Sequence, residues 1–169
     1  MIFKLINGPF SPLAPAAREA AAAALAAQNA AAADPNNARR QADLAGAMGA
    51  LGVAQMAQGG YADAAKSFRS GLDVNDRLMR ADPSNPDHAK ALGQSFANLG
   101  DAQLAMGRPA LAAQSYRDSI AIAEGLARSD PKNAAYQGQV YVAYSKLGDA
   151  LAARNDAVGA EQAYRTSRD

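Results

Sequence analysis

The chain contains no cysteine and no tryptophan, and it has one histidine, His88. Without cysteine there is no disulfide framework, no thiol nucleophile and no cysteine-ligated metal site. A single histidine without a cysteine partner builds neither a Cys–His pair nor a site with several histidine ligands. We therefore interpret His88 as a solvated residue in the first turn of a helix, and we expect a protein that is not an enzyme, with no catalytic residue, no metal and no cofactor.

The residue types that favour β-sheets are also scarce. Valine, isoleucine and threonine are few, and aromatic residues make up 6% of the chain. These are the side chains that normally cover a pleated sheet. Alanine, the strongest intrinsic helix former, makes up roughly a quarter of the sequence. The composition therefore predicts an all-α protein.

No charge of one sign and no long hydrophobic run dominates the sequence. The 17 basic and 16 acidic residues give a formal net charge of +1, which provides no surplus for binding nucleic acid or anionic lipid. No segment approaches the roughly 20 apolar residues that span a bilayer. In the apolar arm 1–10, Asn7, Gly8 and Pro9 interrupt the run before it could form a signal-peptide hydrophobic region. We expect a soluble, cytoplasmic protein without a nucleic-acid partner.

An internal repeat is the strongest pattern that is present. The sequence Asp-Pro-x-Asn begins at residues 34, 82 and 130, at a constant interval of 48 residues. Leu-Gly pairs keep the same interval, and so does an alanine followed four residues later by an aromatic residue and then arginine. These positions are Leu51-Gly52, Leu99-Gly100 and Leu147-Gly148, then Ala64, Ala112 and Ala160, and then Phe68-Arg69, Tyr116-Arg117 and Tyr164-Arg165.

Each unit is predicted to form two helices, which in the first unit cover residues 38–58 and 61–81. Asn37 and its equivalents 85 and 133 can cap the first helix, and the preceding Asp-Pro pairs end the helix before it. A short turn such as Gly59-Gly60 joins the two helices as an antiparallel hairpin. A glycine in mid-helix at 52, 100 and 148 indicates a contact too close for a side chain.

The repeat divides the chain into five parts within one expected domain. The N-terminal arm is followed by an alanine-rich capping helix whose register is left open, because alanine aligns with almost any helix. The predicted parts are the apolar arm 1–10, the capping helix 11–33, and the repeats 34–81, 82–129 and 130–169, of which the last is incomplete.

These repeats resemble the tetratricopeptide repeat (TPR), in which an aromatic residue precedes Leu-Gly and an alanine, an aromatic residue and a proline follow. Phe96 and Tyr144 are the aromatic residues before Leu-Gly, with Met48 in their place in the first unit. The tyrosine of the family pattern is replaced by Gln55, Gln103 and Leu151. The 48-residue period is similar to the long repeats of kinesin light chains. The resemblance covers residues 34–169 and implies a right-handed α-solenoid of antiparallel helix pairs, about seven helices in all.

The resemblance also implies a function, because in this family the first helix of each unit lines a concave groove that holds a partner protein or peptide. Carried over by position, the concave-face residues are Gln94, Asn98, Asp101, Ser145, Lys146 and Asp149. The chain lacks the cationic and amide groups with which one subtype grips chaperone tails. An ordinary solvated surface would have the same polar composition. The alternatives are a structural or self-assembling scaffold element, possible as a homo-oligomer, and the regulatory domain of a larger enzyme.

Overall fold

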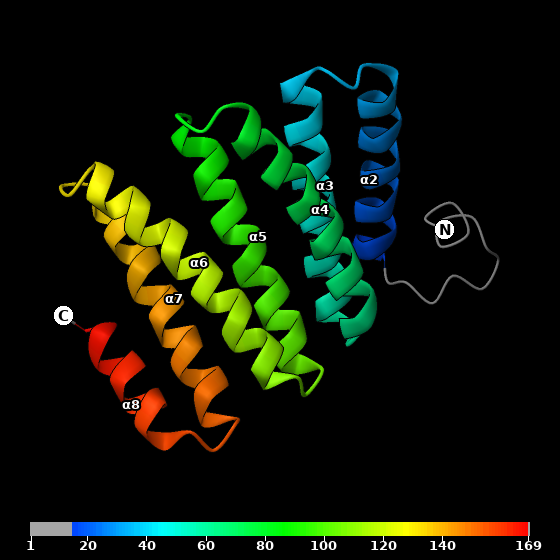
Figure 1. The fold of residues 1–169 in the computed structure, drawn as a ribbon. Helices are drawn as coiled ribbons and strands as arrows, with labels where there is room; N and C mark the ends of the chain where they lie inside the picture. The colour runs from blue at the N-terminus through cyan, green and yellow to red at the C-terminus, as the bar shows by residue number, and fades with distance from the viewer. Residues whose placement is uncertain (1–14, 169) are drawn as a thin grey trace. The chain divides into compact units, whose positions relative to one another are not determined.

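The computed structural model describes residues 15–168, which fold into seven α-helices and contain no β-strand (Figure 1). The helices are α2 (Pro15–Ala33), α3 (Ala38–Ala57), α4 (Tyr61–Ala81), α5 (Pro86–Ala105), α6 (Pro109–Ser129), α7 (Ala134–Ala152) and α8 (Ala157–Thr166). The all-helical fold class predicted from the sequence is confirmed. The predicted arm 1–10 lies outside the described residues. In the part that is described, no helix combines the length and the apolar character needed to cross a membrane.

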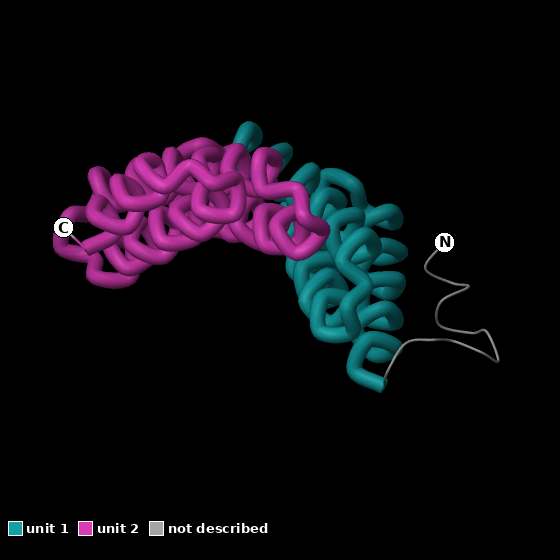
Figure 2. Tube along the Cα trace, turned by 90° about the horizontal axis from the view of Figure 1, so that it is seen from below, with its two compact units in different colours: residues 1–81 teal, residues 82–169 magenta. Residues whose placement is uncertain are grey.

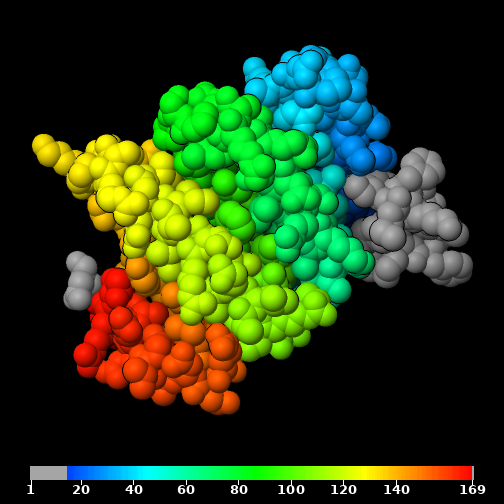
Figure 3. Space-filling view, viewed as in Figure 1, coloured from blue at the N-terminus to red at the C-terminus, as the bar shows by residue number. Residues whose placement is uncertain are grey.

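The chain forms two compact units, residues 1–81 and 82–169 (Figure 2). In unit 1, α2 packs against α3 and α3 packs against α4. In unit 2, α5 packs against α6, α6 against α7, and α7 against α8. Figure 3 shows the side chains of α6, in yellow-green, closely packed on the surface of unit 2. Each hairpin therefore buries its apolar face against the helices that neighbour it in the sequence.

Asparagine side chains begin the first helix of every hairpin, as the sequence predicts. The Asn85 side chain accepts a hydrogen bond from the backbone N–H of Asp87 at 2.9 Å, and Pro86 occupies the first turn. Asn133 caps α7 in the same way at 3.1 Å, and Asn37 caps α3 by accepting from the backbone N–H of Arg40 at 3.2 Å. These bonds satisfy backbone donors that have no partner inside the helix.

The turn within each hairpin also repeats. It contains one residue in the left-handed region, at the same position of all three hairpins: Gly59 (φ 74°), Gly107 (φ 69°) and Asn155 (φ 60°). Glycine and asparagine are the residues that adopt this conformation most readily. The turn therefore reverses the chain within a few residues, so that the two helices of a hairpin run antiparallel.

The mid-helix glycines mark the contact between the two helices of each hairpin. A Cβ atom on Gly100 would stand 2.6 Å from Cε1 of the Tyr116 ring, closer than van der Waals contact allows. Gly52 has the same relation to Phe68, and Gly148 to Tyr164. The close contact predicted at these glycines is confirmed, and the group that requires it is an aromatic ring of the second helix.

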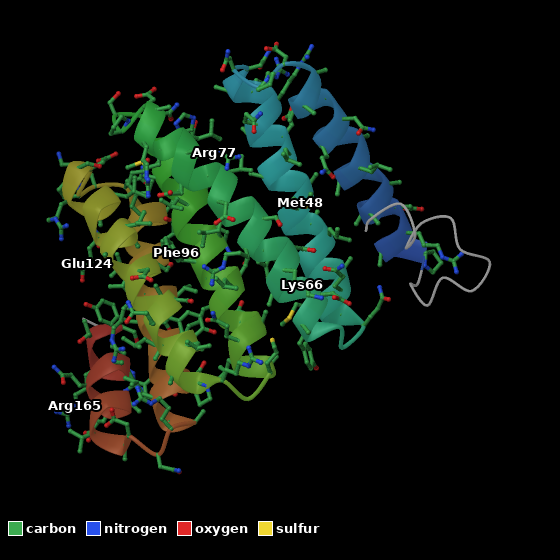
Figure 4. All side chains as sticks on the ribbon, turned by 45° about the vertical axis from the view of Figure 1, so that its right-hand side comes forward. Met48, Lys66, Arg77, Phe96, Glu124 and Arg165 are labelled. Atoms are coloured by element: carbon green, nitrogen blue, oxygen red, sulfur yellow. The ribbon has the colours of Figure 1, made fainter. Side chains whose placement is uncertain are left out.

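Separate apolar clusters hold the helices of each unit. In unit 1, Met48 of α3, labelled in Figure 4, packs with Leu51 against Ala21 and Ala24 of α2. A second cluster joins α3 to α4 through Ala45, Val74 and Leu78. In unit 2 one larger cluster joins α6, α7 and α8, and its buried residues are Ala112, Ala113, Tyr116, Ile120, Ala143, Leu147, Ala150, Leu151, Ala160 and Ala163.

Two hairpins also contain a buried polar pair. The Ser67 hydroxyl donates to Oε1 of Gln55 at 2.7 Å, and the Ser115 hydroxyl donates to Oε1 of Gln103 at 2.8 Å. In the third hairpin the equivalent residues are Leu151 and Ala163, which are buried and apolar. The glutamines that replace the tyrosine of the TPR pattern are therefore paired inside the hairpin.

Two alanine substitutions in α3 should change stability in opposite directions. Gly52→Ala should lower the free energy of unfolding by about 1–3 kcal/mol, because the new methyl group overlaps the Phe68 ring. Gly46→Ala should raise it by up to about 1 kcal/mol, because nothing lies within 4 Å of its Cβ position and alanine favours a helix. Urea unfolding followed by circular dichroism measures both. A shift of the same sign for the two variants would contradict the ring contact.

Candidate functional site

A groove of about 370 Å³ lies in unit 2, where α5, α6 and α7 together line it. We call it the α5–α7 groove. Its lining residues on α5 are Lys90, Gly93, Gln94 and Ala97; on α6, Ser119, Ile122 and Ala123; and on α7, Ala135, Gly138, Gln139, Val142, Ala143 and Lys146. The positions on α5 are spaced three or four apart, so they share one face of that helix. The same holds for α7.

The lining of the groove combines apolar, amide and cationic groups. Ile122 and Val142 provide its larger apolar side chains, Gln94 and Gln139 its amides, and no aspartate or glutamate lines it. The hydroxyl of Ser119 donates to the Gly93 carbonyl at 2.9 Å, so this bond ties α6 to α5. The arrangement suits noncovalent binding of a ligand with an apolar part and an anionic part.

A partly buried cluster joins the three helices that line the groove. Lys146 Nζ of α7 lies 2.6 and 2.7 Å from the two carboxylate oxygens of Asp101 on α5. The Tyr116 hydroxyl of α6 donates to Asp101 Oδ1 at 2.7 Å, and Lys146 Nζ lies 5.9 Å from the centre of the Tyr116 ring. We call this the Tyr116–Asp101–Lys146 cluster. Both charged side chains are only about one-third exposed, at 30% and 34%, so solvent screens their attraction less than it screens that of an exposed ion pair.

Burial and the neighbouring carboxylates perturb the tyrosine of this cluster. Tyr116 is 1% exposed. Burial away from water raises the pKa of its hydroxyl above the usual range. The hydrogen bond to Asp101 and the negative charges of Asp101 and Asp149 raise this pKa further. The hydroxyl therefore stays protonated and keeps donating to Asp101.

A related pair occurs one period later. The Tyr164 hydroxyl donates to Asp149 Oδ1 at 2.7 Å, and this hydrogen bond raises the pKa of Tyr164. In the first hairpin the equivalent residues are Phe68 and Val53, which have no hydroxyl and no carboxylate. An aspartate therefore follows the Leu-Gly pair in the two hairpins whose facing aromatic ring carries a hydroxyl, and not in the first hairpin.

A third tyrosine links α7 to α6. The Tyr144 hydroxyl donates to Glu124 Oε1 at 2.7 Å, and this hydrogen bond raises the pKa of Tyr144. Glu124, labelled in Figure 4, also lies 3.5 Å from Nη1 of Arg128. Glu124 therefore joins the neighbouring helix pairs without lining the groove.

The structure places the six residues predicted at the concave face in several different settings. Gln94 and Lys146 line the α5–α7 groove. Asn98 lies next to Gln94 and accepts from its Nε2 at 2.8 Å. Asp101 belongs to the Tyr116–Asp101–Lys146 cluster, and the exposed Asp149 accepts a hydrogen bond from Tyr164. The remaining residue, Ser145, is half-buried on α7 and does not line the groove. The role of all six in partner binding stays a prediction.

Sequence reasoning missed several residues of the groove. Lys90 lies one turn before Gln94 on the same face of α5, so extending that face toward the N-terminus would have found it. Ile122 was missed for a different reason, because the family resemblance assigns the groove to first helices and Ile122 lies on a second helix. Within residues 15–168, no group of three or more potential metal ligands lies close enough together to hold an ion.

Replacing Tyr116 by phenylalanine should lower the free energy of unfolding by about 1–2 kcal/mol near neutral pH, because the ring is kept and the hydrogen bond to Asp101 is lost. Above about pH 10 the unfolded tyrosine loses its proton while the folded one keeps it, so the wild type loses stability as the pH rises. The difference between the two proteins should therefore shrink between about pH 9 and pH 11 in urea unfolding. A difference that stays constant would contradict the raised pKa.

No family profile and no curated protein matches this sequence. Among solved structures, the chain is similar to the crystal structure of BtubC (BKLC) from P. vanneervenii, with a TM-score of 0.65 and 18% sequence identity. The similarity covers 90% of this chain and 54% of that chain, so the present chain spans about half the length of that structure. At this identity the similarity shows the fold alone, which is a helical repeat.

Proposed function

We propose that this chain is a non-enzymatic interaction module of the tetratricopeptide type, and that it holds a segment of a partner protein in the α5–α7 groove. The observation that carries the proposal is the groove itself, which three helices line with apolar, amide and lysine side chains. The helical-repeat fold and the aromatic-on-glycine contact in every hairpin support the tetratricopeptide assignment.

The charge of the groove indicates what kind of segment would fit. Two lysines and no carboxylate line it, although the whole chain carries a net charge of only +1. Lys146 is already paired with Asp101, whereas Lys90 is exposed on α5. A partner carboxylate would therefore lie beside Lys90.

The apolar part of the groove would provide most of the binding energy, because an exposed ion pair contributes only about 0–1 kcal/mol. Ile122 and Val142 offer apolar surface, and Val142 is 47% exposed. The amides of Gln94 and Gln139 can hydrogen-bond to the main chain of an extended segment. The partner class that fits is an acidic peptide segment with at least one apolar side chain.

Random dodecapeptides displayed on phage and selected on the full-length chain test this proposal. The selected peptides should share an acidic residue next to an apolar one. In isothermal titration of a selected peptide, Val142→Glu should weaken binding by about tenfold or more, and Lys90→Glu by about three- to tenfold.

The matched control is Val158→Glu, because Val158 is 79% exposed on α8 and does not line the groove. This variant should bind as the wild type does. Selected peptides without acidic residues, or equal binding by the Val142 and Val158 variants, would overturn the proposal.

A further inference from the structure

The mid-helix glycines differ in what would surround a side chain at each position. Gly52, Gly100 and Gly148 face an aromatic ring that leaves no space for a side chain. Gly138 is exposed inside α7 and, like Gly46, Gly49 and Gly125, has no atom within 4 Å of the place where a Cβ would stand. Of these four open glycines, Gly138 is the one that lines the α5–α7 groove. Packing within unit 2 therefore does not require a glycine at 138.

The repeat pattern does not require this glycine either. The residues one and two periods earlier are Lys90 and Ala42, which both carry side chains on first helices. A glycine in an exposed helix interior is less stable than alanine. Position 138 therefore keeps a residue that weakens α7 and gives the fold no contact in return.

Gly138 lines the α5–α7 groove together with Lys90 of α5. Gly93, the other glycine of the lining, has an internal explanation, because a Cβ there would come within 3.3 Å of the Ile122 side chain. A ligand in the groove could use the space that Gly138 leaves open. The missing side chain lets the main chain of such a ligand approach the backbone of α7.

We propose that Gly138 is a specificity-determining residue of the groove, over which the main chain of an extended acidic segment passes with its carboxylate toward Lys90. This inference rests on the proposed function, since it assumes that the groove holds a peptide. It adds the position at which the ligand main chain comes closest to α7, and it gives a reason for a glycine at that position. A larger residue at 138 would exclude the segment while leaving the fold intact.

The test compares Gly138→Ala and Gly138→Leu with Gly125→Leu. Gly125 lies in α6 of the same unit, also has nothing within 4 Å of its Cβ position, and does not line the groove. All three variants should raise Tm by about 2–4 °C, because each replaces an open mid-helix glycine with a stronger helix former. In isothermal titration with an acidic dodecapeptide selected on the wild type, Gly138→Leu should bind about tenfold more weakly or worse, and Gly125→Leu within about twofold of wild type.

The outcomes separate this inference from the proposed function. If Gly138→Leu binds the peptide as well as the wild type does, while Val142→Glu does not, the role of Gly138 is overturned and the groove remains the binding site. If no peptide is selected on the wild type, both proposals are overturned. A lower Tm for Gly138→Leu would show that the position is filled by the fold, and would also overturn this inference.

Discussion

The contact between an aromatic ring and a glycine is the interaction on which the rest of this structure depends. It occurs once in every hairpin, and it sets how closely the two helices approach. In the second hairpin the same ring carries the hydroxyl that holds Asp101, and Asp101 in turn holds Lys146 of the next hairpin. A packing contact inside the second hairpin thereby positions the charged Lys146 side chain of the third hairpin. The α5–α7 groove lies beside this side chain.

Much of the fold could be predicted because its determinants are local in sequence. The capping asparagines, the prolines at helix starts and the turn glycines act within a few residues of their own position. The repeat places the capping asparagine and the left-handed turn residue three times along the chain. The alanine-rich α2 was harder, although its buried Ala17, Ala24 and Ala31 lie two periods before the buried residues Ala113, Ile120 and Ala127. Alanine faces are too uniform to fix such a register from sequence alone.

The candidate site could be predicted only in part, because its contacts join distant residues. Asp101 and Lys146 are 45 residues apart, and their pairing depends on how two hairpins pack. From the first helix of each unit alone, both residues were predicted at a binding face. In the structure they pair with each other. Ile122 could be assigned to the groove only from the structure, since an apolar residue on a second helix normally belongs to the core.

The serine–glutamine pairs have a consequence for how the chain assembles. Gln55 and Gln103 each need a hydroxyl opposite, whereas Leu151 of the third hairpin faces Ala163. If a helix of the third hairpin paired with a helix of the first two hairpins, a buried amide or hydroxyl would lose its partner, at a cost of about 1–3 kcal/mol. The polarity of this buried position therefore disfavours pairing a helix of the third hairpin with a helix of the first two.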